Sequence, residues 1–354
     1  MKIVYTGGGT LGSVTPLLAV HEELACDGFE AHWIGTRQGP ERALVERAGI
    51  PFTVIATGKI RRYLHWRNLV DPFLLIIGFV QAMVFLVRTR PRVIVNAGSF
   101  VGVPVVIAGW FLGVPAVILQ LDIDPVRSNL LTAPFARALC VAAEECAQYF
   151  PKEKITVTGI PVRKMVSRPN FAKHHETSQN LDVTVSSILV TGGGTGAQKL
   201  NDLVFQSISR LTEKTDVIHL TGKNKEGESA QLARSNPRYH PAAFEGDTLS
   251  MFMDVDVVVT RAGMGTLAEL SALRKPVIII PIPHSPQEKN AAFAAQHNAA
   301  RILSEENLTP DAFVHAILDL LSNREVRNAL SKNIATLFPS DAATRVARII
   351  RNIV

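Results

Sequence analysis

The chain has 354 residues, enough for two domains of ordinary size with a core in each. Apolar residues make up 47% and charged residues 19%, which excludes a disordered or collagen-like chain. Three cysteines without C-x-x-C spacing disfavour a disulfide scaffold and a zinc ribbon, so reduced thiols in a cytoplasmic protein are expected. The net charge of +6 is concentrated, because residues 47–121 carry eight bases against one acid.

Short β-branched runs alternate with helical patterns along the chain. The runs are residues 2–5, 30–35, 51–55, 92–96, 115–119, 138–142 and 155–159, then 187–191, 216–221, 242–246, 256–260, 275–281 and 301–304. Helical segments between most of them indicate βαβ units and parallel sheets. The segment before the first run is too short for a signal peptide.

The two halves of the chain begin alike. The first strand runs into Thr6–Thr10 (TGGGT), and the eighth runs into Thr191–Gly196 (TGGGTG). Between them, residues 164–186 are polar without a clear period, as in a connector. The sequence therefore predicts an α/β chain of two facing Rossmann-like domains, with parallel sheets and a deep cleft between them. The predicted boundaries are residues 1–160 and 161–338, with a final helix in 339–354 that packs back on the first domain.

Residues 73–87 form an uncharged run of fifteen residues inside the basic segment. As a helix they extend roughly 22 Å, less than the ~30 Å hydrocarbon core of a bilayer, so a spanning helix is disfavoured. One interpretation is a buried helix that covers a parallel sheet. The interpretation we favour is an exposed apolar patch on a membrane surface, with basic and aromatic side chains that anchor it to anionic headgroups. The candidate anchors are Arg61, Arg62, Trp66, Arg67 and Phe73. Nucleic acid is disfavoured because no series of stacking aromatics accompanies the bases.

A glycine-rich turn between a strand and a helix lets backbone N–H groups approach a phosphate. Gly7, Gly9 and Gly12 match G-x-G-x-x-G, but the second strand does not end in the acidic residue that binds a ribose in dinucleotide sites. Neither loop continues as a Walker motif, so a dehydrogenase and a nucleotide hydrolase are both disfavoured. The alternative, that the glycines serve only tight turns, weakens because residues 96–102 (NAGSFVG) repeat the pattern.

Taken together in order and spacing, six motifs resemble the MurG family of UDP-N-acetylglucosamine:lipid-linked muramoyl-pentapeptide N-acetylglucosaminyltransferases, which have the two-domain GT-B fold. The motifs are residues 8–16 (GGTLGSVTP), 98–104, 193–197 with Asn201, 159–163 (GIPVR), 261–269 (RAGMGTLAE) and 286–291 (PQEKNA). The resemblance extends from Met1 to the last helix. It implies peptidoglycan synthesis from UDP-GlcNAc and a polyprenyl-linked acceptor, at the cytoplasmic face of the membrane, with other cell-wall enzymes as possible partners and with no metal or other cofactor.

The resemblance also implies a set of binding residues. Gly263–Gly265 at a helix N-terminus suit the UDP diphosphate, Glu269 suits the ribose hydroxyls, and Arg163 suits the phosphates. For Glu269 alone, a solvated helix face is the alternative. The donor-binding set is Thr10, Leu11, Gly12, Asp122, Arg163, Gly194, Thr195, Glu245, Gly263, Met264, Gly265, Thr266, Leu267, Ala268, Glu269 and Gln287. The set for the acceptor and its phosphates is Gly9, Ser13 and Asn129.

Two motifs depart from the family pattern near the acceptor. Ser13 stands where the family usually has histidine, and Leu119–Asp122 stands where it has His-Glu-Gln-Asn. Serine is no base at neutral pH, so Asp122 or Asp124 is the candidate general base. A solvated pair of acids that caps a helix is the alternative. The departures leave three functions open: transfer to the muramoyl-peptide lipid, transfer to another membrane glycolipid, and UDP-sugar binding without catalysis.

Overall fold

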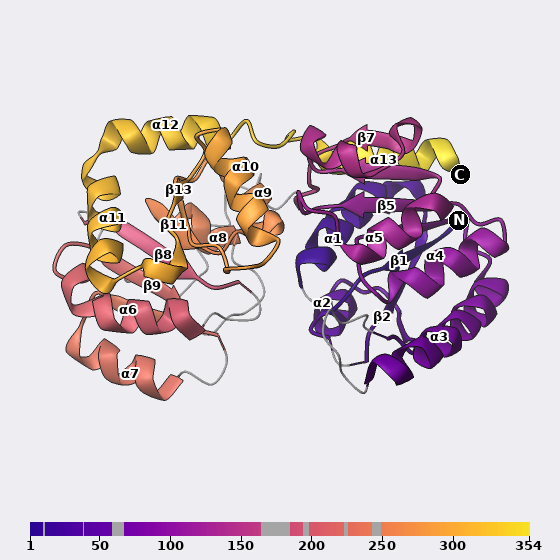
Figure 1. Cartoon of the computed structure of the whole chain (residues 1–354), viewed down its shortest axis with the longest axis horizontal. Helices are drawn as coiled ribbons and strands as arrows, with labels where there is room; N and C mark the ends of the chain where they lie inside the picture. The colour runs from indigo at the N-terminus through magenta and orange to yellow at the C-terminus, as the bar shows by residue number, and fades with distance from the viewer. Residues whose placement is uncertain are drawn as a thin grey trace. The chain divides into compact units, whose positions relative to one another are not determined.

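The computed structural model describes residues 1–9, 11–37, 39–58, 67–163, 185–193, 198–222, 226–242 and 249–354, with residues 67–72 and 226–228 described by their backbone only. The chain forms two compact units (Figure 1). The first unit contains residues 1–163 together with residues 338–354, and the second contains residues 164–337.

The first unit is built on a seven-stranded sheet in which all neighbouring strands are parallel, in the order β3-β2-β1-β4-β5-β6-β7. Its strands are β1 (Lys2–Thr6), β2 (Glu30–Gly35), β3 (Phe52–Val54), β4 (Val93–Asn96), β5 (Ala116–Gln120), β6 (Ala138–Val141) and β7 (Ile155–Val157). Its helices are α1 (Val14–Leu24), α2 (Glu41–Arg47), α3 (Arg67–Thr89), α4 (Gly102–Phe111), α5 (Arg127–Thr132) and α13 (Ala342–Ile353), with short 3₁₀ turns at Leu11–Ser13, Ala25–Asp27, Ala133–Phe135, Glu144–Tyr149 and Lys152–Lys154.

Both faces of this sheet are covered. Along β1, Ile3 and Tyr5 pack in a core with α1 and α13, whereas Val4 packs in a second core with α3 and α4. Successive side chains of a strand point to opposite faces, so a strand buried on both sides is apolar throughout. This explains the continuous β-branched runs in the sequence.

The second unit repeats the design with six parallel strands in the order β10-β9-β8-β11-β12-β13. The strands are β8 (Ser187–Thr191), β9 (Asp216–Leu220), β10 (Tyr239–Ala242), β11 (Val257–Thr260), β12 (Val277–Ile279) and β13 (Arg301–Ile302). The helices are α6 (Gln198–Leu211), α7 (Glu226–Ser235), α8 (Leu249–Met253), α9 (Met264–Leu273), α10 (Gln287–Gln296), α11 (Pro310–Ser322) and α12 (Arg324–Ile334), with a 3₁₀ turn at Glu305–Asn307. Helices α6 and α11 share one apolar core with the sheet.

Of the predicted strand at residues 242–246, only Ala242 lies in the described part of the chain, where it is the last residue of a strand that begins at Tyr239. The strand is β10, and it pairs Tyr239 with Val217 and Ala242 with Leu220. Pro241 argues against a strand there, because proline has no N–H to donate to a neighbour. β10 is an edge strand, however, with a neighbour on one side only, and such a strand tolerates proline.

Helix α13 packs on the first unit although it lies at the end of the chain (Figure 1). Val346, Ala347 and Ile350 are fully buried in the core that also contains α1. Thr344 Oγ1 donates to Glu23 Oε1 at 3.1 Å, and Arg351 Nε lies 2.8 Å from Asp27 Oδ2. These contacts close one face of the first sheet.

Candidate functional site

Each sheet has one point where the strand order reverses. In the first sheet it lies between β1 and β4, and in the second it lies between β8 and β11. Open parallel sheets bind ligands beyond the carboxyl ends of the strands at such a point. The first two glycine loops follow β1 and β4, whereas the third loop and residues 261–265 follow β8 and β11. Each unit therefore has two predicted binding loops at its own reversal point.

The first glycine loop is held by the body of its unit. Gly9 has φ +81°, a conformation that favours glycine, and its N–H donates to Glu41 Oε2 at 3.1 Å. Trp33 Nε1 donates to the carbonyl of Gly7 at 3.0 Å. Ser13, at the end of the 3₁₀ turn, is buried.

Buried amides order the second glycine loop and the segment after β5. Asn96 Oδ1 accepts from Gly98 N at 3.3 Å, and a Cβ on Gly102 would lie 2.2 Å from the same oxygen. Asn129 Nδ2 donates to Leu119 O at 3.0 Å and to Gln120 Oε1 at 2.8 Å. Asn129 is fully buried, so the structure gives it a positioning role, and a direct contact with the acceptor stays a prediction.

The candidate bases Asp122 and Asp124 lie in the segment that follows β5, and both are half-buried. Gln120 Nε2 donates to the carbonyl of Asp122 at 2.6 Å and to that of Asp124 at 3.3 Å. The fully buried Gln120 therefore fixes the backbone that carries both acids. Burial raises the pKa of the nearby Cys146 thiol to about 11, which makes it a weak nucleophile.

A neutral hydrogen-bonded chain crosses the second unit beside its glycine loop. Asn201 Nδ2 donates to Thr221 O at 2.8 Å, which leaves Asn201 Oδ1 to accept from His219 Nε2 at 3.1 Å. His219 Nδ1 then accepts from the Tyr239 hydroxyl at 2.9 Å. Burial lowers the pKa of His219 to about 3, so the imidazole is neutral. This chain joins the first turn of α6 to β9 and β10.

The start of α9 divides the predicted donor residues between two faces. Gly263 is the N-cap of this ten-residue helix, and Gly265, Thr266 and Glu269 lie on its half-buried face. Met264, Leu267 and Ala268 are buried in the unit, so their side chains face its core and not a ligand. The N–H groups of a first helical turn have no intrahelical partner and attract anions.

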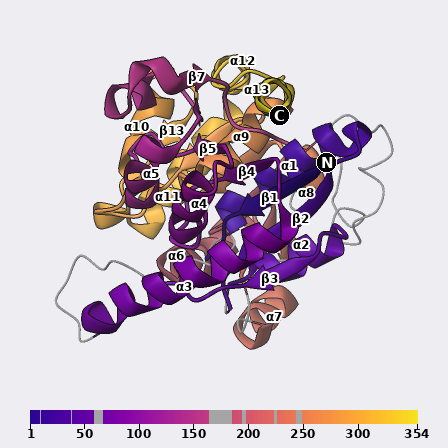
Figure 2. The ribbon, with the colours of Figure 1, turned by 90° about the vertical axis from the view of Figure 1, so that its right-hand side faces the viewer.

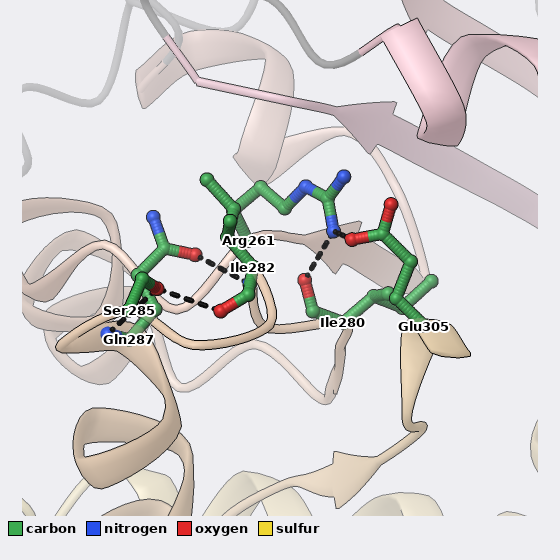
Figure 3. Close-up of polar contacts among 6 residues, drawn as sticks. All are labelled: Arg261, Ile280, Ile282, Ser285, Gln287 and Glu305. Atoms are coloured by element: carbon green, nitrogen blue, oxygen red, sulfur yellow. Dashed lines mark hydrogen bonds and ion pairs between the residues drawn. The ribbon is translucent and has the colours of Figure 1, made fainter. Parts of the chain in front are cut away.

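Two sets of contacts support the loop before α9, and Figure 3 shows the first of them, made by Arg261. Arg261 Nη1 donates to Ile280 O at 2.9 Å and lies 2.8 Å from Glu305 Oε2; Arg261 is buried, and the Glu305 side chain is 9% exposed. Asn290 Nδ2 donates to Ala262 O at 3.0 Å.

The loop that carries Gln287 follows β12. Ile282 N donates to Gln287 Oε1 at 3.2 Å, and Ser285 Oγ bridges the loop by donating to Ile282 O at 2.6 Å (Figure 3). The carboxyl ends of β11 and β12 are thus fixed together, because Arg261 in the first loop reaches the end of β12.

Several predicted residues lie outside the described part of the chain. They are Thr10, Gly194, Thr195, Glu245, Arg61, Arg62 and Trp66, and Arg67 is described by its backbone only. Arg163 and Leu11–Ser13 lie in the first unit, whereas Gly263–Glu269 and Gln287 lie in the second. Among the described residues, no group of three or more His, Cys, Asp or Glu side chains is arranged to hold a metal ion.

Helix α3 has one face in the core and an apolar face in solvent. Ala82 and Leu86 are buried against the sheet. Phe73, at 68% exposed, begins a row of solvent-exposed side chains at helical spacing that continues with Ile76, Ile77, Val80, Val84 and Val87. The sequence-based interpretation of an exposed patch therefore agrees with the structure, and Figure 2 shows α3 along the outer edge of the first unit. Within the described residues, no helix is long and apolar enough to cross a bilayer.

The end of α4 extends this apolar face. The Phe79 ring of α3 contacts the Phe111 ring of α4, with their centroids 5.8 Å apart, and Trp110 and Phe111 are both more than half exposed. Beside Trp110, a surface pocket of about 820 Å³ lies at the amino ends of β5 and β6. Because the glycine loops follow the carboxyl ends of the strands, this pocket is not part of the candidate site.

Comparison with known proteins agrees with this arrangement. The glycosyltransferase family 28 N-terminal domain matches residues 3–141, and the glycosyltransferase family 28 C-terminal domain matches residues 187–346. The chain belongs to glycosyltransferase family 28. Within family 28, a relative from Lachnoclostridium phytofermentans is 35% identical over 94% of each chain. A relative from Legionella pneumophila is 32% identical over 99% of this chain and 96% of its own length.

Both family 28 relatives are named UDP-N-acetylglucosamine--N-acetylmuramyl-(pentapeptide) pyrophosphoryl-undecaprenol N-acetylglucosamine transferase. Among solved structures, Acinetobacter baumannii MurG matches with a TM-score of 0.75 at 23% identity over 99% of each chain. Neisseria meningitidis UDP-GlcNAc 2-epimerase bound to UDP-GlcNAc matches with a TM-score of 0.70 at 12% identity, over 99% of this chain and 100% of the other. The expected family and the α/β GT-B fold are confirmed.

The sequence motifs did not predict the residues that fix the loops from positions distant in the sequence. Glu41, Gln120, His219 and Glu305 each contact a predicted motif but lie outside every glycine pattern. Polar residues in otherwise apolar strands, such as Gln120 and His219, are the one signal that pointed to them, because a buried polar group needs a partner.

Proposed function

We propose that this chain transfers N-acetylglucosamine from UDP-GlcNAc to the muramoyl-pentapeptide carried on undecaprenyl diphosphate, with inversion and without a metal ion. The observation that carries the proposal is that relatives bearing this activity in their names align over 94–99% of the chain. Two parallel sheets with glycine loops at their reversal points suit a reaction between two phosphate-containing substrates.

The second unit is the proposed donor site. The open N–H groups at Gly263–Gly265 attract the diphosphate, and Glu269 on the same helix face accepts from the ribose hydroxyls. Gln287 adds a neutral polar contact from the loop after β12. The buried Arg261–Glu305 pair supports this proposal because it fixes the backbone immediately before the helix.

The first unit is the proposed acceptor site. In the transfer, the acceptor hydroxyl attacks the anomeric carbon of the sugar, the bond from that carbon to the UDP oxygen breaks, and the hydroxyl proton passes to a base. Asp122 or Asp124 is the proposed base, since Ser13 cannot take the proton at neutral pH. The segment that carries both acids is fixed by Gln120, which suits a group that must be placed accurately.

A membrane surface is the proposed location, at its cytoplasmic face. The exposed apolar row on α3 and the exposed aromatic side chains at the end of α4 suit insertion among lipid headgroups. The predicted anchors Arg61, Arg62, Trp66 and Arg67 precede or begin α3, so they adjoin the row in sequence. Peripheral binding brings the enzyme to an acceptor that cannot leave the bilayer.

Transfer of labelled GlcNAc to vesicles that contain the muramoyl-pentapeptide lipid tests the proposal, with other membrane glycolipids in parallel and with EDTA. We expect EDTA-resistant transfer to the muramoyl-pentapeptide lipid. Transfer only to another glycolipid would favour the second function that the departures at Ser13 and Asp122 leave open. Donor binding without transfer or hydrolysis in any arm would favour a binding protein.

A further inference from the structure

A carboxylate lies buried beneath the first glycine loop. Glu41 is the first residue of α2, and its side chain is fully shielded from solvent. A buried charge is costly unless hydrogen bonds satisfy it, so such a group is retained where its contacts have a use. None of the sequence motifs includes Glu41.

Both oxygens of this carboxylate receive hydrogen bonds. Oε2 accepts from the N–H of Gly9 at 3.1 Å, and Oε1 accepts from the N–H of Thr36 at 2.8 Å and from the Thr36 hydroxyl. A backbone N–H can only donate, so both oxygens act as acceptors, as an ionised carboxylate does. The Glu41 carboxylate therefore joins the loop after β1 to the loop after β2.

The Glu41 carboxylate fills a space that exists because the residues around it are glycines without side chains. A Cβ on Gly8 would lie 2.3 Å from Glu41 Oε1, and a Cβ on Gly39 would lie 1.7 Å from Oε2. A Cβ on Gly35 would lie 3.3 Å from Oε1. Glycines from the loop after β1, from the end of β2 and from the loop after β2 thus surround the carboxylate. Gly8 also belongs to the family motif, which gives that glycine a use other than close approach to a ligand.

We propose that Glu41 is a positioning residue that holds the first glycine loop ready for the acceptor diphosphate. The proposal rests on the proposed function. Gly9 keeps its left-handed conformation because its N–H is bound from behind by Glu41. A single N–H that already donates to a carboxylate is not open to a phosphate, so a phosphate is received by the N–H groups that follow Gly9. Gly9 then contributes to acceptor binding through its backbone conformation, which shapes the loop, and not through a hydrogen bond to the phosphate.

The key variant is Glu41→Gln, which keeps the shape of the side chain and removes its charge. A Gln amide can still accept from Thr36 through its oxygen, but its NH₂ group then faces the N–H of Gly9, and two donors repel. Thr36→Val is the matched control, because it removes one hydrogen bond to the same carboxylate and leaves the bond to Gly9 intact. Glu41→Asp is the alternative variant in case Glu41→Gln does not fold; it keeps the charge, and its shorter side chain draws the carboxylate away from Gly9.

Two measurements on the full chain test the proposal: amide hydrogen exchange of residues 7–13, and kcat/KM for the acceptor. We expect Glu41→Gln to speed exchange in residues 7–13 and to lower kcat/KM at least about tenfold, or about 1.4 kcal/mol. The Kd for UDP, which lacks the sugar, should change much less than kcat/KM, because the proposed contacts to its nucleoside and diphosphate are in the second unit, although the predicted donor set also includes Thr10, Leu11 and Gly12. Thr36→Val should stay within about threefold of the wild type in both measurements.

Three results would overturn the proposal. The first is a fall in kcat/KM of less than tenfold for a Glu41→Gln protein that folds. Glu41 would then have only a structural role, even if the melting temperature of the variant is lower. The second is an equal loss in Thr36→Val, and the third is unchanged exchange in residues 7–13. If the wild type transfers sugar to no acceptor, the proposed function fails, and the exchange of residues 7–13 alone decides whether Glu41 holds the loop.

Discussion

The two units hold the loops at their reversal points by different kinds of contact. In the first unit, a buried carboxylate and a set of buried amides hold the loops at the reversal point, through Glu41, Asn96 and Asn129. In the second unit, a neutral Tyr239–His219–Asn201 chain holds one side and the Arg261–Glu305 ion pair holds the other. Two similar sheets therefore do not imply similar support for the loops they carry.

This difference coincides with where the chain departs from its family. By the resemblance described above, the donor motifs of the second unit follow the family pattern, whereas Ser13 and Asp122 in the first unit are expected departures from it. A donor that is the same across a family fixes its site chemistry, because every polar contact must be met. The comparison predicts that damage in the second unit lowers stability and donor affinity, whereas damage in the first unit lowers turnover.

The largest expected effect is on the stability of the second unit. Arg261→Met leaves the Glu305 carboxylate, whose side chain is only 9% exposed, without its partner, so the free energy of unfolding should fall by about 3–5 kcal/mol. Urea denaturation followed by circular dichroism measures it. Arg210→Met, which breaks an exposed ion pair with Asp311 in the same unit, is the control and should cost less than about 1 kcal/mol. Equal losses in both variants would show that the buried pair has no special role.

Turnover tests the first unit. Asp122→Asn or Asp124→Asn should lower kcat at least about a hundredfold with little change in donor affinity, as expected for a base that acts in the transition state. Ser13→His, which restores the usual family residue, should partly rescue the impaired variant. Steady-state kinetics with a confirmed acceptor measures both. Near-full turnover in both Asn variants would exclude a displaced base.

Donor affinity tests the second unit. Glu269→Ala should weaken UDP-GlcNAc binding by about 1.5–3 kcal/mol, because a charge-assisted hydrogen bond to the ribose is lost. Isothermal titration calorimetry measures the Kd, and an unchanged melting temperature controls for the fold. A Kd equal to that of the wild type would remove Glu269 from the site.

Acid should weaken the second unit through His219. Its folded pKa of about 3 lies below the usual histidine value of 6.5, so the unfolded state binds the proton more tightly. The contribution of neutral His219 is therefore complete above pH 6.5 and is lost as the pH falls towards 3. At pH 5 the loss is about 2 kcal/mol. Urea denaturation at pH 7.5 and pH 5 measures it, and His219→Asn should remove this part of the pH dependence.

The smallest effect per residue concerns the membrane. Each change of Arg61, Arg62 or Arg67 to Gln should weaken binding to anionic vesicles by about 1 kcal/mol, and added salt should mimic the change. Phe73→Ser, at the start of the exposed row, should weaken binding to anionic and neutral vesicles alike. Vesicle sedimentation measures both. Equal binding of the wild type to anionic and neutral vesicles would show that these arginines make no specific contribution to membrane binding.

The sequence was sufficient for features that repeat along the chain. The β-branched runs located β1 and β8 because strands buried on both faces are apolar throughout, and the paired glycine loops revealed the repeated design. The start of the edge strand β10 at Tyr239 was not predicted, because Pro241 is disfavoured in a central strand but tolerated at an edge, and strand order is not visible in sequence.

The supporting contacts could not be predicted for a related reason. Glu41 and Gly9 are 32 positions apart, and Arg261 and Glu305 are 44 positions apart, so no local pattern joins them. Asn129 was predicted to contact the acceptor, and nothing in its sequence neighbourhood reveals that its amide is buried among Asn96, Leu119 and Gln120. A motif identifies a loop, whereas the partners that hold the loop depend on the fold.

The return of α13 to the first unit has a consequence for synthesis on the ribosome. Residues 164–337 form the second unit as one continuous stretch, whereas the first unit needs residues 338–354 to complete it. Until Val346, Ala347 and Ile350 emerge, the core beside α1 lacks one wall. The second unit has all of its own residues before the first does, so the part of the protein that is translated first cannot complete its core until the rest of the chain has been made.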